Sequence, residues 1–345
     1  MQNSDASDTP RERVLAALPD DLDGVVLETP GVVSWYLGGA RTSVPLGGDS
    51  VVAVLVGREG DEVRCHVMEA ERLLAEEGIG DVIAVDWTEP LVPESWRNDP
   101  RIAPERRLEA QLRVARASLT DIEVERYRAL GAEVSRAVTS VAAATTAGDA
   151  ERSIAGHLAH SLYSLGAEPV VLLVAGSARL GYRHPLPTSA PLGERAMLVV
   201  GARRHGLTVN LTRWVQFSGP EHENEPGIRA VEAEILDATR PGAALADLLV
   251  TLRRAYPANG FDPEEWHSHH QGGPTGYLGR DPKVTPSTGG VVAEGQAFSW
   301  NPSAPGVKVE DTVLATASGV ELLTHDPAWP TTTVAGRPRP LTMRL

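Results

Sequence analysis

The sequence predicts two domains, an N-terminal α/β domain and a larger C-terminal α+β domain. Three observations lead to this prediction. Short apolar runs alternate with helical patterns over about the first 86 residues, a long capped helix begins near residue 120, and strand-like runs with polar clusters follow it. With 345 residues, of which 42% are hydrophobic and 23% charged, the chain can bury one large core or two ordinary ones.

The N-terminal elements follow from the spacing of apolar residues. Strands are expected where β-branched residues run together, and helices where apolar residues recur every three or four positions. The predicted strands are residues 24–28, 51–57, 63–68 and 82–86, and the predicted helices are residues 12–18 and 70–78. The single cysteine, Cys65, falls in the third strand and is expected to be a small buried hydrophobe, since one cysteine makes no internal disulfide.

A Pro-rich, charged passage at residues 87–107 is expected to be a linker or exposed connection. After it, Thr120 and Glu123 form a capping-box pattern, apolar residues recur at helical spacing, and Gly148 marks the predicted end of a long helix. The domains are therefore placed at residues 1–115 and 116–345.

The charge of the chain excludes some classes of function. A formal net charge of −14 and a sequence pI of about 5.2 would repel phosphate backbones, so we expect no nucleic-acid partner. No apolar run approaches the roughly 20 residues needed to span a bilayer, and residues 1–13 lack a secretory apolar segment. We therefore expect no membrane partner and a cytoplasmic protein.

Two stretches carry the chemistry. Residues 197–213 contain two apolar runs around a Gly-containing turn, with Val199 and Asn210 eleven residues apart. Residues 266–312 contain the dense cluster HSHHQGGPTGY, then the strand-like AFSWNP, then KVEDTVLAT.

These stretches resemble the creatinase and methionine-aminopeptidase superfamily, which includes peptidase family M24 and has the pita-bread fold. Metallopeptidases of that superfamily carry an Asp-x-Gly segment, a second Asp followed by x-Thr-Arg, a His in a Gly-rich loop, a Glu-Pro pair and a late Glu-Asp-Thr. The corresponding positions in this chain are Val199, Asn210, His270, Asn301 and Glu310. The resemblance implies a creatinase- and prolidase-like protein with two domains.

The resemblance also implies that most metal ligands are lost. Only His270 and Glu310 are competent ligands, whereas a catalytic divalent ion needs about three protein ligands. We therefore expect no metal and no other cofactor. His269 competes with His270 for the pocket-facing position, and a His-rich metal site built from His267, His269 and His270 stays open as an alternative.

His184 matches the position of the histidine that protonates substrate in creatinase and assists turnover in the aminopeptidases. It precedes Val199 by fifteen residues, and an imidazole with an ordinary pKa of about 6.5 can give and take a proton near neutral pH. The expected catalytic residues are therefore His184, His270 and Glu310.

The expected substrate-binding residues are polar groups around these positions. Asn210 and Asn301 offer both donors and acceptors, and an arginine offers a fork for a carboxylate. Arg280 is preferred as this fork over Arg213 and Arg183, because it follows the glycine-rich loop. Asp311 is expected to face the other side of its strand. The full predicted set is Asn210, Arg213, His269, Arg280 and Asn301.

The function that these residues predict is metal-independent hydrolysis of a C–N bond in a small polar compound, similar to creatinase. Two alternatives stay open: an M24 metallo-aminopeptidase or Xaa-Pro peptidase with an atypical site, and a non-catalytic peptide-binding module. The resemblance implies a homodimer, with Trp35 and Tyr36 of the N-terminal domain near the partner's active site.

Overall fold

The computed structural model describes residues 9–345, and the chain divides into two compact units, Met1–Ala117 and Ser118–Leu345. The division falls two residues after the predicted boundary between 1–115 and 116–345. Within the described part of the chain, no helix is both long enough and apolar enough to cross a bilayer.

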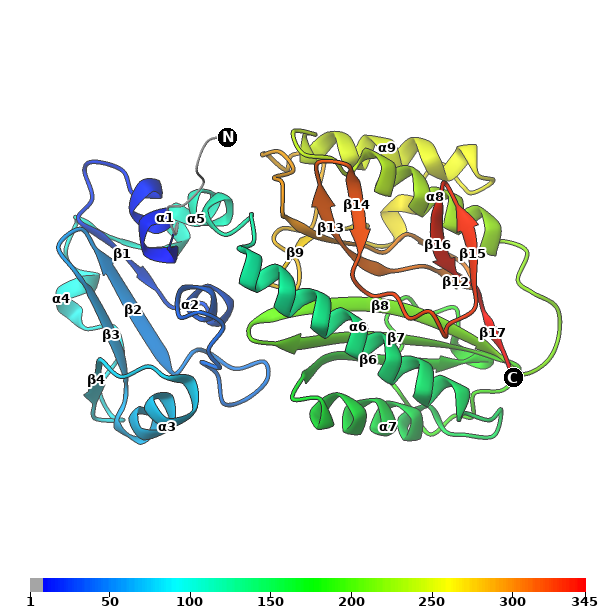
Figure 1. Cartoon of the computed structure of the whole chain (residues 1–345), viewed down its shortest axis with the longest axis horizontal. Coiled ribbons are helices and arrows are strands. Elements are labelled where there is room, and N and C mark those ends of the chain that lie inside the picture. Colours follow the sequence, from blue (N-terminus) through cyan, green and yellow to red (C-terminus); the bar gives the residue numbers. More distant parts are fainter. Residues whose placement is uncertain (1–8) are drawn as a thin grey trace. The chain divides into compact units, whose positions relative to one another are not determined.

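The N-terminal unit is built on a mixed five-stranded sheet in the order β4-β3-β2-β1-β5 (Figure 1). Its strands are β1 (Gly24–Leu27), β2 (Val52–Gly57), β3 (Asp61–His66), β4 (Val82–Val85) and β5 (Ile102–Pro104). Its helices are α1 (Pro10–Ala17), α2 (Pro30–Tyr36), α3 (Val67–Glu77), α4 (Glu94–Arg97), η1 (Glu105–Leu108) and α5 (Glu109–Ala115). The predicted α/β character is confirmed, and Cys65 is fully buried as expected.

Two parts of this unit differ from the prediction. The Pro-rich passage 87–107 is largely exposed, which agrees with an exposed connection. It is not a linker, because it supplies β5, which pairs with β1, and buries Trp96. Proline is tolerated there because β5 is an edge strand. Residues 30–36 form α2, and Pro30 suits its first turn, whose N–H groups have no helical partner. Trp35 is 2% exposed and therefore belongs to the core of its own unit.

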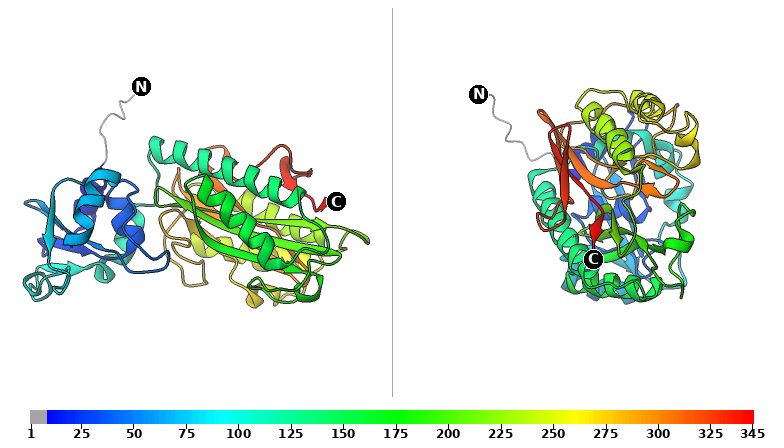
Figure 2. Two further views of the ribbon diagram at one scale, coloured as in Figure 1. Left: turned by 90° about the horizontal axis from the view of Figure 1, so that it is seen from below. Right: turned by 90° about the vertical axis from the view of Figure 1, so that its right-hand side faces the viewer.

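The C-terminal unit begins with two helices, α6 (Asp121–Ala143) and α7 (Glu151–Ser164), that lie along one face of a sheet (Figures 1 and 2). The sheet has the order β17-β8-β7-β6. Its strands are β6 (Glu168–Gly176), β7 (Arg195–Arg204), β8 (Leu207–Gln216) and β17 (Met343–Arg344). The predicted capping box at Thr120 and Glu123 starts α6. The helix ends before Gly148, because the Thr145 hydroxyl donates to Ala142 O and so favours a turn.

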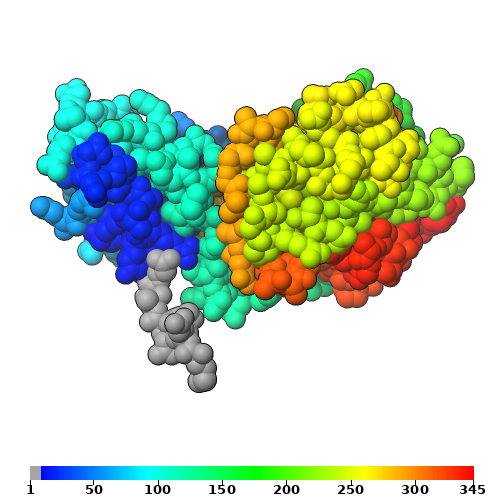
Figure 3. All heavy atoms as spheres, turned by 90° about the horizontal axis from the view of Figure 1, so that it is seen from above, coloured from blue at the N-terminus to red at the C-terminus, as the bar shows by residue number. Residues whose placement is uncertain are grey.

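The second half repeats this arrangement. Helices α8 (Glu225–Ala238) and α9 (Leu245–Ala258) cover a sheet in the order β14-β13-β10-β9. In Figure 3 they belong to the yellow-green and yellow part of the surface. Its strands are β9 (Gly272–Thr275), β10 (Ala297–Trp300), β13 (Asp311–Thr316) and β14 (Gly319–Leu322). The shorter elements of the unit are η2 (Ser177–Arg179), η3 (Glu265–Ser268), β11 (Ser303–Ala304), β12 (Val307–Lys308), β15 (Thr331–Val334) and β16 (Arg337–Pro340).

Two sheets between two pairs of helices make the α+β pita-bread domain that the sequence predicts. The sheets are joined where β8 meets the residue before β13. Thr212 donates its backbone N–H to Glu310 O and its hydroxyl to Glu310 Oε2, both at 3.0 Å. Nearby, Asn210 N donates to Thr312 Oγ1 at 2.8 Å, and the Thr312 hydroxyl donates to Asn210 O at 3.0 Å.

A buried charge network lies behind this joint. The Arg339 side chain is 1% exposed and forms ion pairs with Glu232 of α8 and, at 2.7 Å, with Asp311 Oδ2. Arg213 Nη2 donates to Asp311 Oδ1 at 2.9 Å and to Thr324 O at 2.7 Å. Because every charge here has an opposite partner, removing one of them leaves an uncompensated buried ion.

Replacing Arg339 with Met should therefore destabilise the C-terminal unit by about 3–5 kcal/mol, because Glu232 and Asp311 lose their shared cation. Urea-induced unfolding followed by circular dichroism measures the change. The matched control is Arg128→Met, which removes an exposed pair with Glu321 and should cost no more than about 1 kcal/mol. Equal losses in the two variants would contradict the structural role of the network.

Candidate active site

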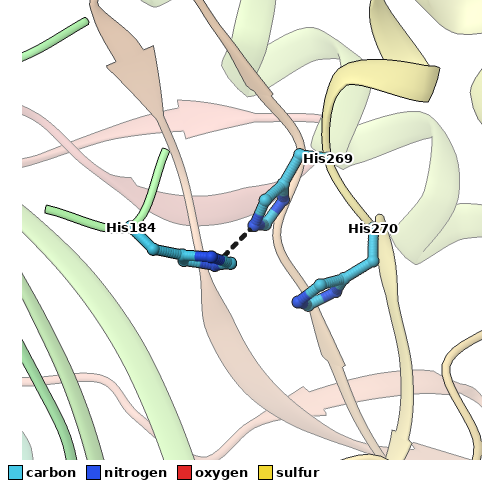
Figure 4. Close-up of side chains that lie close together, drawn as sticks. All are labelled: His184, His269 and His270. Carbon is cyan, nitrogen blue, oxygen red and sulfur yellow. Dashed lines mark hydrogen bonds between the residues drawn. The ribbon is translucent and has the colours of Figure 1, made fainter. Parts of the chain in front are cut away.

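Three histidines from two distant parts of the chain lie together in the C-terminal unit. His184 follows η2, whereas His269 and His270 lie between η3 and β9 (Figure 4). The Nε2 atoms of His184 and His269 are hydrogen-bonded at 2.9 Å, and the rings of His269 and His270 stack with centroids 4.3 Å apart. All three expected histidines therefore share one site, whereas His267 is paired with Glu264 at the surface.

Arg183 fixes the loop that carries His184. Its guanidinium donates to Ser303 Oγ at 3.0 Å and forms an ion pair with Glu265 in η3. These contacts tie the loop to the segment that carries His269. Arg183 was a candidate for binding a substrate carboxylate, and the structure gives it this structural partner instead.

Gln271 fixes the histidine segment from its other side. Its amide nitrogen donates to Trp266 O at 3.0 Å and to His269 O at 2.7 Å, and its amide oxygen accepts from Tyr256 Oη at 2.8 Å. Since Gln271 is 2% exposed, these bonds hold the backbone around His269 and His270 without competition from water.

The glycines of this loop serve backbone packing. Gly272 has φ of 103°, and a Cβ there would lie 2.1 Å from Ser299 O. Gly273 has φ of 143°, and a Cβ there would lie 2.6 Å from Pro282 O. Residues with side chains fit neither position, so both glycines are needed for β9 to pair with β10.

Glu310 lies at the joint of the two sheets and has two cationic partners. Arg280 Nη2 lies 2.8 Å from its Oε1, and Lys308 Nζ lies 3.0 Å from its Oε2, which also accepts from the Thr212 hydroxyl. Burial raises the pKa of Glu310, but the charges of Lys308 and Arg280 outweigh it and lower the pKa to about 2. Glu310 is therefore ionised, and Arg280 is bound to it and is not a free fork.

The histidines are neutral at neutral pH. Burial is the main cause that lowers the pKa of His269 to about 2 and that of His270 to about 4. The charge of Lys308 adds to the effect at His269, and that of Arg280 at His270. Burial and then Lys308 also lower the pKa of the more exposed His184.

The remaining positions of the predicted site are neutral or apolar. Asn210 Nδ2 donates weakly to Ser299 Oγ at 3.4 Å, and Asn301 is 2% exposed. Val199 packs in an apolar cluster with Leu173, Met197, Trp214 and Leu180. A hydrophobic surface therefore stands at the position where the superfamily has its first aspartate.

Arg213 does not lie with the histidines. It follows Thr212 in β8, so its side chain leaves the opposite face of the strand from the hydroxyl that contacts Glu310. Arg213 is bound to Asp311 in the buried network described above, which corrects its expected role in binding substrate. The expectation that Asp311 faces away from Glu310 is confirmed.

Several buried polar atoms of this site have no hydrogen-bond partner. These atoms are His269 Nδ1, His270 Nδ1, Arg280 Nε and Asn301 Oδ1. A buried donor or acceptor without a partner costs about 1–3 kcal/mol, and bound water or a ligand removes that cost. Their concentration here indicates a site for a polar ligand.

Comparisons with known proteins agree with this architecture. The model of metallopeptidase family M24 matches residues 125–317, which is more than half of the chain. The chain belongs to metallopeptidase family M24. Its predicted assignment to a family of hydrolases that cleave C–N bonds is thereby confirmed.

Individual relatives are distant. An uncharacterized peptidase of Staphylococcus aureus is 24% identical over 191 residues, 52% of this chain and 54% of the relative. The chain thus spans about half the length of the staphylococcal relatives that it matches. The Xaa-Pro dipeptidase of Pyrococcus furiosus is 21% identical over 338 residues, 88% of this chain and 94% of the relative.

Solved structures show the same fold over nearly the whole chain. The prolidase of Pyrococcus horikoshii matches with a TM-score of 0.74 and 18% identity, covering 92% of this chain and 98% of that one. A Xaa-Pro dipeptidase of Bacillus anthracis matches with a TM-score of 0.76 and 14% identity, covering 97% and 99%. The predicted fold, a prolidase-like member of family M24 with two domains, is confirmed.

The two-metal site of family M24 does not fit the residues of this member. Val199 offers no ligand atom, and the amides of Asn210 and Asn301 carry no charge. Glu310 is the one carboxylate among the five positions, and two cations already bind its oxygens. Two divalent ions here would be repelled by the positive charges of Lys308 and Arg280, and only the single negative charge of Glu310 would attract them.

The three histidines are the alternative place for an ion. Among residues 9–345, they form the one group whose potential ligand atoms all lie close together, within 4.8 Å of one another. Their imidazoles are neutral, which suits a metal ligand. However, no carboxylate belongs to the group, and the charges of Lys308 and Lys283 lie near enough to lower the pKa of His184.

Sequence reasoning missed Lys308 and Gln271. Lys308 stands two residues before Glu310 and, with Lys283, is one of only two lysines among 32 basic residues. Both lysines influence the pKa of His184. In a chain that otherwise uses arginine, this rarity was the available signal. The sequence carried no comparable signal for Gln271, because its role depends on its hydrogen bond with Tyr256 and on the conformation of the loop.

The pKa shifts predict a loss of stability at mildly acidic pH. In the unfolded chain a histidine takes up a proton near pH 6.5, whereas folded His270 does so only near pH 4. Its contribution is therefore fully present above pH 6.5 and falls as pH drops toward 4, by up to about 1.4 kcal/mol per pH unit. His270→Gln should reduce this slope between pH 6 and 4.5, measured by urea unfolding at each pH.

The matched control for this prediction is His267→Gln. The His267 side chain is 59% exposed and stands three residues from His270, so its replacement should leave the slope unchanged. If the free energy of unfolding of His270→Gln has the wild-type pH dependence, then His270 has the same pKa in the folded and the unfolded chain, and the prediction is wrong.

Proposed function

We propose that this M24 member hydrolyses the C–N bond of a short peptide, with Xaa-Pro dipeptides as the first substrate class to test. Its family and its similarity to the Xaa-Pro dipeptidase of Pyrococcus furiosus over 88% of the chain support a peptidase. They favour this alternative over creatinase-like hydrolysis of a small polar compound. We also propose that the site is atypical and works without a metal ion. Glu310 is the only carboxylate among the five metal-ligand positions, and its charge is already compensated by Lys308 and Arg280.

The observation that carries the proposal is a neutral, partly exposed His184 held in place by a second histidine. In the hydrogen bond with His269, one Nε2 donates and the other accepts. When His184 Nε2 donates, its Nδ1 keeps a lone pair that can take a proton from water. His184 then acts as the general base and returns the proton to the leaving nitrogen.

The other residues bind and orient. His270 and Asn301 carry unpartnered buried atoms that suit the polar backbone of a peptide, Nδ1 and Oδ1 respectively. We expect an uncharged side chain such as proline to pack against the apolar cluster of Val199, Met197 and Trp214. Asn210 is held by Ser299 and Thr312 and supports the wall between the two sheets.

His184→Asn should lower the rate of dipeptide hydrolysis by roughly 10²- to 10⁴-fold and leave the fold intact, because the residue lies in an exposed loop. The assay is release of free amino acid from Ala-Pro, Leu-Pro and peptides without proline, with amidines and ureido acids as the creatinase-like class. His267→Asn is the control and should retain the wild-type rate.

The same assay in a strong chelator, with elemental analysis of the dialysed protein, tests independence from metal. Activity that survives chelation and a metal content well below one ion per chain are expected. Stoichiometric zinc, manganese or cobalt would favour the metallopeptidase reading at the three histidines. Peptide binding with no turnover of any compound would favour the non-catalytic binding module.

We also propose that the chain forms a homodimer, as the resemblance to creatinase implies. The buried Trp35 takes no part in this proposal, because it packs in its own unit. Light scattering should give a mass near twice 36.8 kDa. A mass near that of one chain would exclude a stable dimer.

A further inference from the structure

Lys308 is a buried lysine whose ammonium group contacts Glu310, the one carboxylate among the five positions that match metal ligands of the superfamily. Its side chain is 6% exposed, and that of Arg280 is 11% exposed. Their two cationic groups lie against the two oxygens of Glu310, at 3.0 and 2.8 Å, so one carboxylate holds two positive charges. We call Lys308, Arg280 and Glu310 the cation triad.

The cation triad has donors left for a ligand. An ammonium group has three N–H donors, and within the described chain Lys308 uses its ammonium for Glu310 Oε2. Arg280 Nε is buried and has no partner. Glu310 offers one negative charge against the two positive charges of Lys308 and Arg280, so the triad keeps one uncompensated positive charge in a poorly solvated place. A negative group on a ligand would gain charge-assisted hydrogen bonds from both residues.

The triad lies beside the residues proposed for acid–base chemistry. In the β11–β12 hairpin, Lys308 stands opposite Ser303, whose hydroxyl accepts from Arg183, the neighbour of His184. The charge of Lys308 is, after burial, the largest influence on the pKa of both His184 and His269. The pairing of Lys308 with Ser303 and the hydrogen bond from Arg183 to Ser303 thus connect the triad to the loop that carries His184.

We propose that Lys308 and Arg280, held by Glu310, bind the carbonyl oxygen of the scissile bond and stabilise the negative charge that develops on it, in place of metal ions. This inference rests on the proposed C–N hydrolysis. It makes Lys308 a catalytic residue and explains why the two-metal ligand set is not needed.

The step balances with water as the only co-reactant. The water oxygen forms a bond to the carbonyl carbon while His184 accepts a proton from the water. The π electrons of the C=O bond move to the oxygen, which becomes an anion bound by Lys308 and Arg280. The C=O bond then re-forms from the electrons on the oxyanion, and the C–N bond breaks as the nitrogen takes the proton from His184. The products are a carboxylic acid and an amine, and the acid then gives up its proton to the amine or to solvent.

The test uses a phosphinic-acid analogue of Ala-Pro, in which a negatively charged phosphinate replaces the scissile amide. Calorimetry on the full chain in chelator should show binding, because fixed cations receive the anion. Lys308→Met and Arg280→Met should each weaken binding about 10- to 100-fold, and Lys308→Arg should restore part of it.

Lys283→Met is the matched control, since it removes the other lysine, which is exposed and outside the triad. It should weaken binding by no more than about 3-fold. Equal loss in Lys283→Met and Lys308→Met would overturn the proposal, as would binding that disappears in chelator.

A measurement on the wild-type protein removes any dependence on how the variants fold. Because the chain has only two lysines, ¹³C-lysine labelling gives two sets of side-chain signals. The Lys308 set, assigned with Lys283→Met, should shift when the analogue binds, whereas the Lys283 set should move little. An unmoved Lys308 signal at saturating analogue would overturn the proposal.

The two proposals fail in different ways. If the analogue binds through Lys308 but no peptide is cleaved, the anion site stands and the proposed hydrolysis fails. If dipeptides are cleaved and Lys308→Met cleaves them at the wild-type rate, the hydrolysis stands and the role of Lys308 fails.

Discussion

The carboxylate of Glu310 is the group on which the site depends. It is 2% exposed, and each of its oxygens has a cationic partner. Its backbone and side chain both bond to Thr212, so the same residue also joins the two sheets of the C-terminal unit. A buried carboxylate is stable only when its charge is compensated, and here the compensation comes from Lys308 and Arg280.

This compensation decides which chemistry the site supports. In a metallopeptidase, carboxylates offset the charge of divalent ions, and the ions polarise the substrate. In this chain, Val199 and the two asparagines carry no negative charge that could offset metal ions. The positive charges at the site are instead the side chains of Lys308 and Arg280. The excess positive charge and burial together keep the nearby imidazoles neutral, so a histidine can accept a proton near neutral pH.

The surrounding residues provide rigidity more than chemistry. Arg183 ties the His184 loop to η3, and Gln271 ties the histidine segment to Tyr256. Gly272 lets β9 approach β10 closely enough to pair. Such supports matter because acid–base groups act only when they are held within hydrogen-bond reach of the reacting atoms.

The sequence by itself determined the fold class, because strand alternation and the capping box at Thr120 are local signals that tertiary packing did not override. It also identified His184, His270 and Glu310, whose spacing follows the superfamily, although their proposed roles rest on that resemblance. For residues 87–107 the exposed connection was right and the linker was wrong, because residues 102–104 form an edge strand. The pairing of that strand with β1 depends on the tertiary fold.

Only the tertiary structure decided what each charged residue pairs with. The sequence favoured Arg280 over Arg213 for binding substrate but gave neither its partner. Arg213 pairs with Asp311 and Arg280 with Glu310, since adjacent residues point to opposite faces. Lys308 became a candidate only when the β11–β12 hairpin placed its ammonium at Glu310. Charge compensation acts through space between residues of different elements, and no local pattern in the sequence encodes it.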